Sequence, residues 1–114
     1  GYAAGKHYIP GVALKFGEHP VEAGHRILTE ELEVEDREIK YVSTQSHWNE
    51  EKKHWYVLFL FETVDPLTED EMKNTCKGID ELVYFDLEDA TIENSTQGLM
   101  DIREAMRNPG KTYI

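Results

Sequence analysis

The sequence predicts an α+β fold in which a mixed sheet lies between two helices. Two stretches, one from Pro20 and one after Ser95, repeat apolar residues at helical spacing, and residues 37–48 and 54–64 have strand patterns. At 114 residues the chain is long enough for one hydrophobic core and too short for two. We therefore expect a single domain over residues 1–114, with the element order β-β-α-β-β-β-α.

The first elements are predicted from residues 7–34. "HYIPGVALKF" places two short apolar runs around Pro10-Gly11, which indicates a strand, a sharp turn and a second strand. The helix that follows has Pro20 in its first turn, where proline is favoured. Its expected apolar side consists of Val21, Ala23, Gly24, Ile27, Leu28 and Leu32, and its polar side of Glu22, Arg26, Glu30 and Glu33.

The middle of the chain predicts a long hairpin. Residues 37–48 alternate, with Ile39 and Tyr41 on one face and Lys40 and Val42 on the other, and they lead to the turn "NEEKK". "HWYVLFLFETV", residues 54–64, is apolar on both faces, which is typical of a central strand covered on both sides.

The last part predicts a strand and a helix. "DPLTEDEMKNTCKG" is a polar connection with room for one helical turn, and "ELVYF", residues 81–85, has the composition of a strand. Ser95 or Thr96 can cap the final helix, in which Leu99, Ile102 and Met106 recur at helical spacing.

The composition restricts the partners. With 23 acidic and 12 basic residues the net charge is −11, which opposes binding to nucleic acid and to anionic membranes. A phosphate ligand would need a divalent cation, or a local basic patch, to approach such a chain. The longest apolar run is far shorter than the roughly 20 residues of a membrane helix, and the lone Cys76 fits a reducing compartment. We therefore expect a cytoplasmic protein without a membrane span.

Two adjacent glutamates suggest a metal site. On an α-helix Ile27, Glu30 and Glu31 stand at i, i+3 and i+4, so their side chains share a face. Two carboxylates near backbone carbonyls form the oxygen-rich site that Mg²⁺ or Mn²⁺ prefers. Such pairs are common in an acidic chain and usually face water, so the spacing alone leaves both interpretations open.

The surrounding motif resembles the Nudix hydrolases, whose box reads G-x5-E-x7-R-E-U-x-E-E-x-G-U with U a bulky apolar residue. If Arg26 is the box arginine, six of the nine fixed positions agree, namely Glu18, Arg26, Leu28, Glu30, Glu31 and Val34. The flanks "YIPG", "GEHPVEAGHR" and "DELVYFDLEDA" are also similar to family segments. The resemblance implies an α/β/α sandwich and metal-dependent hydrolysis of a nucleoside diphosphate linked to another moiety.

The chain departs from the box at three positions. Val12 and Glu33 replace its two glycines, and Ile27 replaces the glutamate after the arginine, which in the family helps to bind metal or activate water. The GDP-mannose mannosyl hydrolases also lack that glutamate, and this similarity implies cleavage of a nucleotide sugar at the sugar carbon. It also implies one Mg²⁺ held by Glu31, the Gly11 carbonyl and a late-loop glutamine.

The general base is not given by the resemblance. The subgroup uses a late-loop histidine, but Gly78 and Ile79 stand near the expected glutamine and histidine. Asp80, Glu81 and His47 are the candidate replacements, because a carboxylate or a neutral imidazole can accept a proton. The alternative for His47 is an ordinary surface or hairpin position.

The beginning of the chain predicts an oligomer. Nudix folds usually have one or two strands before the lead-in, whereas nine residues precede Pro10. An apolar sheet edge without these strands would favour strand pairing with another copy, so we expect a homodimer, with swapped strands as one way of forming it.

Three functions are carried forward. The first is a divergent Nudix hydrolase acting on a nucleotide sugar with Mg²⁺ or Mn²⁺ bound through Glu31, Glu30 and the Gly11 carbonyl, with Glu18 locking Arg26 and Arg26 the helix. The second is a catalytically inactive Nudix-like module that binds a nucleotide or a protein partner. The third is a plain acidic α+β protein whose box match is chance.

Overall fold

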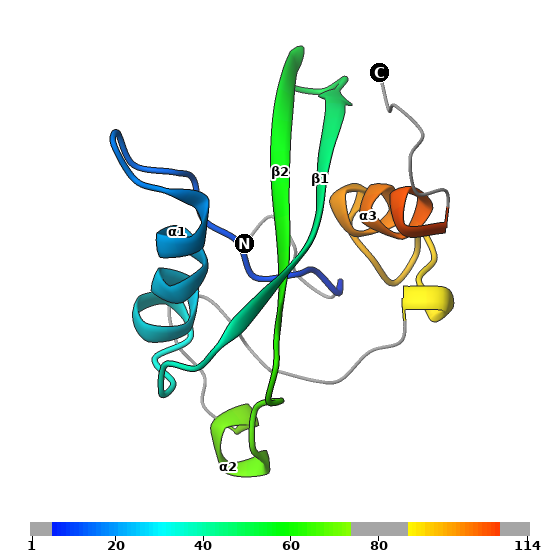
Figure 1. The fold of residues 1–114 in the computed structure, drawn as a ribbon. Helices are drawn as coiled ribbons and strands as arrows, with labels where there is room; N and C mark the ends of the chain where they lie inside the picture. The colour runs from blue at the N-terminus through cyan, green and yellow to red at the C-terminus, as the bar shows by residue number, and fades with distance from the viewer. Residues whose placement is uncertain (1–5, 74–86, 108–114) are drawn as a thin grey trace. The chain divides into compact units, whose positions relative to one another are not determined.

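The computed structural model describes residues 6–73 and 87–107 (Figure 1). The chain divides into two compact units, one drawn from residues 1–9, 43–60 and 85–114 and the other from residues 10–42 and 61–84. We call the first the outer unit, because it includes both ends of the sequence, and the second the inner unit. These names refer to the sequence alone, and each unit is described by itself. Together the described residues form a small α+β fold with a two-stranded antiparallel sheet and a few short helices.

The inner unit begins with the predicted helix. In α1, Pro20–Arg26, Pro20 takes the first position, and the imidazole of His19 caps the helix by accepting a 3.1 Å hydrogen bond from the Val21 N–H. The helix then widens into a π-helical turn, η1, Ile27–Glu31, in which the Leu32 N–H donates to the Ile27 carbonyl over 2.8 Å.

Behind α1 and η1 lies a small apolar core. Leu28, Leu32 and Val34 are buried, and Ile27, Ile39 and Leu67 pack against them. A Cβ on Gly24 would lie 2.6 Å from Ile39 Cδ1, so a larger residue here would require the end of the Ile39 side chain to move. Most of the predicted apolar side is confirmed, but Val21 is 40% exposed, because it lies in the first turn, away from this core.

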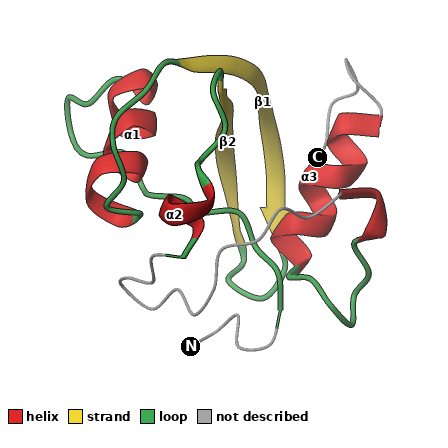
Figure 2. Ribbon diagram, turned by 90° about the horizontal axis from the view of Figure 1, so that it is seen from below, coloured by secondary structure: helices red, strands yellow, loops and turns green. Residues whose placement is uncertain are grey.

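Both strands of the predicted hairpin are confirmed. Figures 1 and 2 show β1, Ile39–Asn49, beside β2, His54–Thr63, and the predicted turn connects them at residues 50–53. In the outer unit the rings of Trp48 and Trp55 lie 5.4 Å apart. In the inner unit those of Tyr41 and Phe61 lie 6.1 Å apart.

The prediction that β2 is covered on both faces does not hold for the described residues. Their sheet contains only β1 and β2, so β2 has a partner on one edge. Its Trp55, Val57 and Phe59 are exposed, whereas the alternate residues 56, 58 and 60 are half-buried. The strand therefore has one covered face and one open face in this part of the chain.

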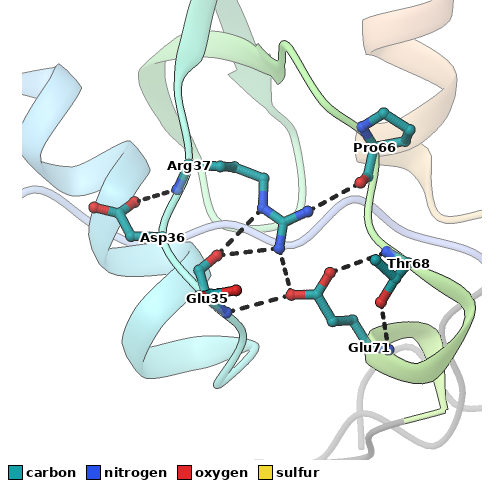
Figure 3. Close-up of polar contacts among 6 residues, drawn as sticks. All are labelled: Glu35, Asp36, Arg37, Pro66, Thr68 and Glu71. Atoms are coloured by element: carbon teal, nitrogen blue, oxygen red, sulfur yellow. Dashed lines mark hydrogen bonds and ion pairs between the residues drawn. The ribbon is translucent and has the colours of Figure 1, made fainter.

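The inner unit contains a polar cluster in the segment that follows β2. The predicted helical turn is α2, Glu69–Met72, which starts with a capping box between Thr68 and Glu71. Figure 3 shows how the Arg37 guanidinium reaches this turn and donates to the carboxylate of Glu71 and to the carbonyls of Pro66 and Glu35. One arginine thus joins the segment before β1 to the segment after β2.

In the outer unit α3, Gln97–Arg107, follows the 3₁₀ turn η2, Leu87–Asp89. Thr96 is the cap, since its Oγ1 accepts a 3.3 Å hydrogen bond from the Leu99 N–H. Leu99 and Ile102 are buried as predicted, but Ala105 completes the buried stripe, and Met106 is exposed. One position further along a helix is a rotation of about 100°, which turns Met106 away from this stripe.

The two strands predicted for residues 7–16 are not present. His7 forms a single parallel bridge with Ser95, through a 2.7 Å hydrogen bond from its N–H to the Asn94 carbonyl, and residues 8–15 have no regular structure. Pro10 has no N–H to give to a ladder, which is one physical reason for the difference. The strand predicted at residues 81–85 lies outside the described residues. No helix in the described ranges is long and apolar enough to cross a membrane.

Candidate functional site

The centre of the candidate site is an ion pair in the inner unit. The Arg26 guanidinium donates two hydrogen bonds of 2.9 Å to the carboxylate of Glu18, one from Nε and one from Nη2. The Nη2 group also donates to the Ala13 carbonyl over 2.9 Å. Both charged side chains are largely covered, at 14% and 12% exposure. The predicted contact between Glu18 and Arg26 is confirmed, and it ties the loop before α1 to the last turn of the helix.

This pair shifts both ionisation equilibria toward the charged forms. The hydrogen bond from Arg26, followed by that from the Lys15 N–H, lowers the pKa of Glu18 from 4.5 to about 2. The pKa of Arg26 is raised, first by Glu18 and to a smaller extent by Glu30 and Glu31. Glu18 is therefore a charged structural anchor at neutral pH and is too weak a base to accept a proton there.

The loop held by this pair ends in a tight turn. The Glu18 N–H donates to the Lys15 carbonyl over 3.0 Å, and the Lys15 N–H donates to Glu18 Oε1 over 3.0 Å. Gly17 has φ = 79°, the left-handed conformation that glycine adopts at low cost. Glu18 thus bonds Lys15 through both its backbone N–H and its carboxylate, and Arg26 holds the same carboxylate in place.

The two box glutamates lie on η1. Glu30 is exposed and Glu31 is half-buried, whereas Ile27 packs against the apolar core. The argument that these three residues share a face assumed an α-helix, and it fails here because the π-helical turn is wider. Ile27 belongs to the core side of the segment.

The donor set is small for a metal ion. Across the described residues no group of three or more His, Cys, Asp or Glu side chains is placed to hold one. Mg²⁺ is commonly bound by only one or two carboxylates together with water and substrate phosphates. The described residues therefore offer no closed protein cage for a metal ion. Gly11, the expected carbonyl ligand, lies in the exposed loop with no neighbour within 4 Å of its Cβ position.

Of the three candidate bases, only His47 lies in the described part of the chain. Asp80 and Glu81 lie outside the described residues. His47 belongs to the outer unit and is buried, at 5% exposure, in β1, so the alternative of a hairpin position is confirmed and that of a surface position is wrong. Its Nε2 lies 2.8 Å from Gln45 Oε1, and the Gln45 amide donates to Ser43 Oγ over 3.0 Å. A buried imidazole in a strand network of this kind fits a structural role more simply than proton transfer.

Two contacts in the inner unit were not predicted. His25 Nδ1 lies 2.6 Å from Asp36 Oδ1, and this contact is the first cause of the lowered pKa of Asp36. Arg37 pairs with Glu71 across 34 positions of sequence. Neither pair has a motif or a periodic spacing that would reveal it, because each joins segments that only the fold brings together.

Comparisons of the chain with protein-family models, with curated proteins and with solved structures found no significant match.

Proposed function

We propose that the chain is a divergent Nudix-type hydrolase with a Nudix-like α/β/α architecture over residues 1–114. The observation that carries this proposal is the bidentate pair between Glu18 and Arg26. These residues stand at the first glutamate and the arginine of the box, and their contact fixes the loop to the helix that leads to Glu30 and Glu31. A chance match of letters would not require two residues eight positions apart to bind each other.

The backbone after η1 gives further support. Glu33 occupies the position of the second box glycine and has φ = 54°, in the left-handed region that glycine favours. A glutamate adopts this conformation at some cost, so the surrounding structure must impose it. A glycine at this position of the box would adopt the same conformation without that cost.

The proposed substrate is a nucleoside diphosphate linked to another group, most plausibly a nucleotide sugar. Mg²⁺ or Mn²⁺ shared with its phosphates would neutralise their charge and orient the leaving group. Glu30 and Glu31 are the proposed carboxylate ligands, together with the Gly11 carbonyl. Glu18 and Arg26 are positioning residues, and Asp80 and Glu81 are the remaining candidates for the base.

The direct test is product release from a panel of nucleotide sugars, dinucleotides and nucleoside triphosphates with Mg²⁺ and with Mn²⁺. Glu31→Gln removes one proposed ligand, and Glu22→Gln, an exposed residue of α1 at a variable position of the box, is the matched control. We expect turnover that Glu31→Gln abolishes and Glu22→Gln leaves unchanged. No turnover of any compound by the wild-type protein would contradict the proposal.

A second candidate is a catalytically inactive Nudix-like module that binds a nucleotide or a protein. The observation that favours it is Ile27, which stands where the box has a glutamate and packs into the core. Binding of a nucleotide with Mg²⁺ in the absence of turnover would select this function over the first.

The proposal includes a homodimer and a cytoplasmic location. Trp55, Val57 and Phe59 form an exposed apolar row on β2, and such a row is a common feature of association surfaces. We expect light scattering at micromolar concentration to give twice the 13.2 kDa chain mass. A monomer mass under these conditions would contradict the dimer. The cytoplasm is proposed on the lone Cys76, which is typical of a reducing compartment.

A further inference from the structure

The tight turn at residues 15–18 exposes an aromatic side chain that no structural role explains. Phe16 is 109% exposed, the highest value among the large apolar residues of the described ranges, and Leu14, which precedes the turn, is 45% exposed. Phe16 precedes Gly17, whose φ of 79° closes the turn, and is therefore held at the corner. Lys15 is also exposed, and no described residue forms an ion pair with its ammonium group.

The turn is held firmly although its tip is bare. Lys15 contributes both its N–H and its carbonyl to hydrogen bonds with Glu18, and Glu18 is fixed by Arg26. The Ala13 carbonyl is bound by the same guanidinium. A rigid turn presents its side chains without the entropy loss that a mobile loop suffers on binding.

The turn carries one positive charge, on Lys15. The other charged residues between residues 10 and 25, with histidines neutral, are Glu18, which is paired with Arg26, and Glu22, in a protein whose net charge is −11. A phosphate ligand needs such a local positive charge to approach, because the long-range field repels it. The neighbouring Phe16 offers a bare aromatic ring, on which a nucleobase can stack.

We propose that this turn recognises the nucleotide part of the ligand, with Lys15 pairing with a phosphate and Phe16 stacking on the base. The inference rests on the proposed function and names the residues that select its substrate class. It belongs to the same unit as Glu18, Arg26, Glu30 and Glu31. The neighbouring cation and ring match the two chemical parts of a nucleoside diphosphate.

The test is calorimetric binding of ADP and of inorganic pyrophosphate, each with Mg²⁺, to wild type and to single variants. We expect Phe16→Ala to weaken ADP binding about tenfold and to leave pyrophosphate binding unchanged, since only ADP has a base to stack. Lys15→Gln should weaken both ligands about tenfold, with a smaller effect at high salt. The controls are Lys52→Gln, which removes an equal charge from the hairpin turn, and Val64→Ala, which removes an exposed apolar side chain.

The outcomes separate this inference from the proposed function. If the wild type binds ADP and both turn variants bind it equally well, the turn is not the recognition element, whereas the hydrolase proposal stands. If the wild type binds neither ligand and turns over no compound of the panel, both proposals fail. Binding to anionic phospholipid vesicles that depends on Phe16, without ADP binding, would instead identify a membrane contact and overturn the inference. Both positions are exposed, so unchanged melting temperatures are expected for the variants.

Discussion

Glu33 has a backbone conformation that side chains with a Cβ disfavour. Its φ of 54° lies in the left-handed region, where an L-residue other than glycine is strained by roughly 1–2 kcal/mol. Glycine would relieve the strain but would also gain freedom in the unfolded chain, which offsets part of the benefit. We expect Glu33→Gly to raise the free energy of unfolding by about 0.5–1 kcal/mol in urea denaturation. In the control Glu22→Gly, inside α1, the same change should lower it by about 1 kcal/mol, and a loss at both positions would contradict the assignment of strain.

Glu18 links stability to acid pH. Its pKa falls from 4.5 to about 2 in the folded protein, mainly through the hydrogen bond from Arg26. A depressed carboxyl pKa gives stability that is fully present above about 4.5 and is lost as the pH falls toward 2. We expect the urea midpoint of Glu18→Gln to vary less than that of wild type over this range.

Other carboxyl groups also contribute to the dependence of stability on pH. Asp36, Glu50, Glu71 and Glu88 also have lowered pKa values, so the variant should keep part of the acid dependence. Glu22→Gln should follow the wild-type curve. A Glu18→Gln curve parallel to wild type between pH 4.5 and 2 would show that the pair contributes nothing there.

At the scale of the elements, the sequence patterns predicted those helices and strands that depend mainly on interactions between residues close in sequence. The alternation of β1, the turn at residues 50–53 and the helical spacing of α3 were sufficient to place these elements. The run at residues 7–16 has a similar apolar composition, but a strand also needs partners for its backbone groups, and those depend on distant segments. The π-helical form of η1 could not be predicted from the spacing of apolar residues either. It depends on how side chains such as Ile27 pack in the core.

The candidate site was predictable to the extent that a motif fixes its contacts. The resemblance to the box gave the contact of Glu18 with Arg26, and it placed Glu30 and Glu31 on the same helix, whereas the structure has them on the π-helical turn that follows α1. It could not give the contact between Arg37 and Glu71, in which the two partners follow no common pattern. The spacing of residues predicts contacts within one helix or strand. The contact between Arg37 and Glu71 joins two segments that are distant in sequence, so it depends on the tertiary fold.

That pair allows a test of how the inner unit is held together. Arg37 is 12% exposed and donates to one carboxylate and two carbonyls, from Glu71, Glu35 and Pro66 (Figure 3). Arg37→Ala leaves these acceptors without the guanidinium, so we expect the free energy of unfolding to fall by about 2 kcal/mol in urea denaturation.

Two controls define this result. Arg37→Lys keeps the charge but loses the planar fork, so it should lie between wild type and alanine. Arg107→Ala removes the more exposed ion pair with Glu88 and should change the free energy by about 0.5 kcal/mol or less. Equal losses for Arg37→Ala and Arg107→Ala would mean that the contacts of Arg37 add no more than a surface pair.

At the scale of the whole molecule the excess of acidic residues is the dominant property. A net charge of −11 makes folding compress like charges, so added salt should stabilise the protein by screening alone. The same charge would repel the proposed anionic substrate, and a cation that joins carboxylate and phosphate would offset that repulsion. Because screening and specific metal binding would both stabilise the fold, an experiment must separate them.

The separation comes from comparing Mg²⁺ with NaCl at equal ionic strength, in wild type and in the double variant Glu30→Gln/Glu31→Gln. An ion that binds only the folded protein adds about 1.4 kcal/mol at ten times its dissociation constant, which raises the melting temperature by roughly 5–10 °C for a chain of this size. We expect this extra rise over NaCl in wild type, with Mg²⁺ and with Mn²⁺, and its loss in the double variant and on addition of EDTA. Because NaCl screens both proteins in the same way, an equal rise in wild type and variant would assign the whole effect to screening. Glu30 and Glu31 would then be solvated surface on the turn that follows α1.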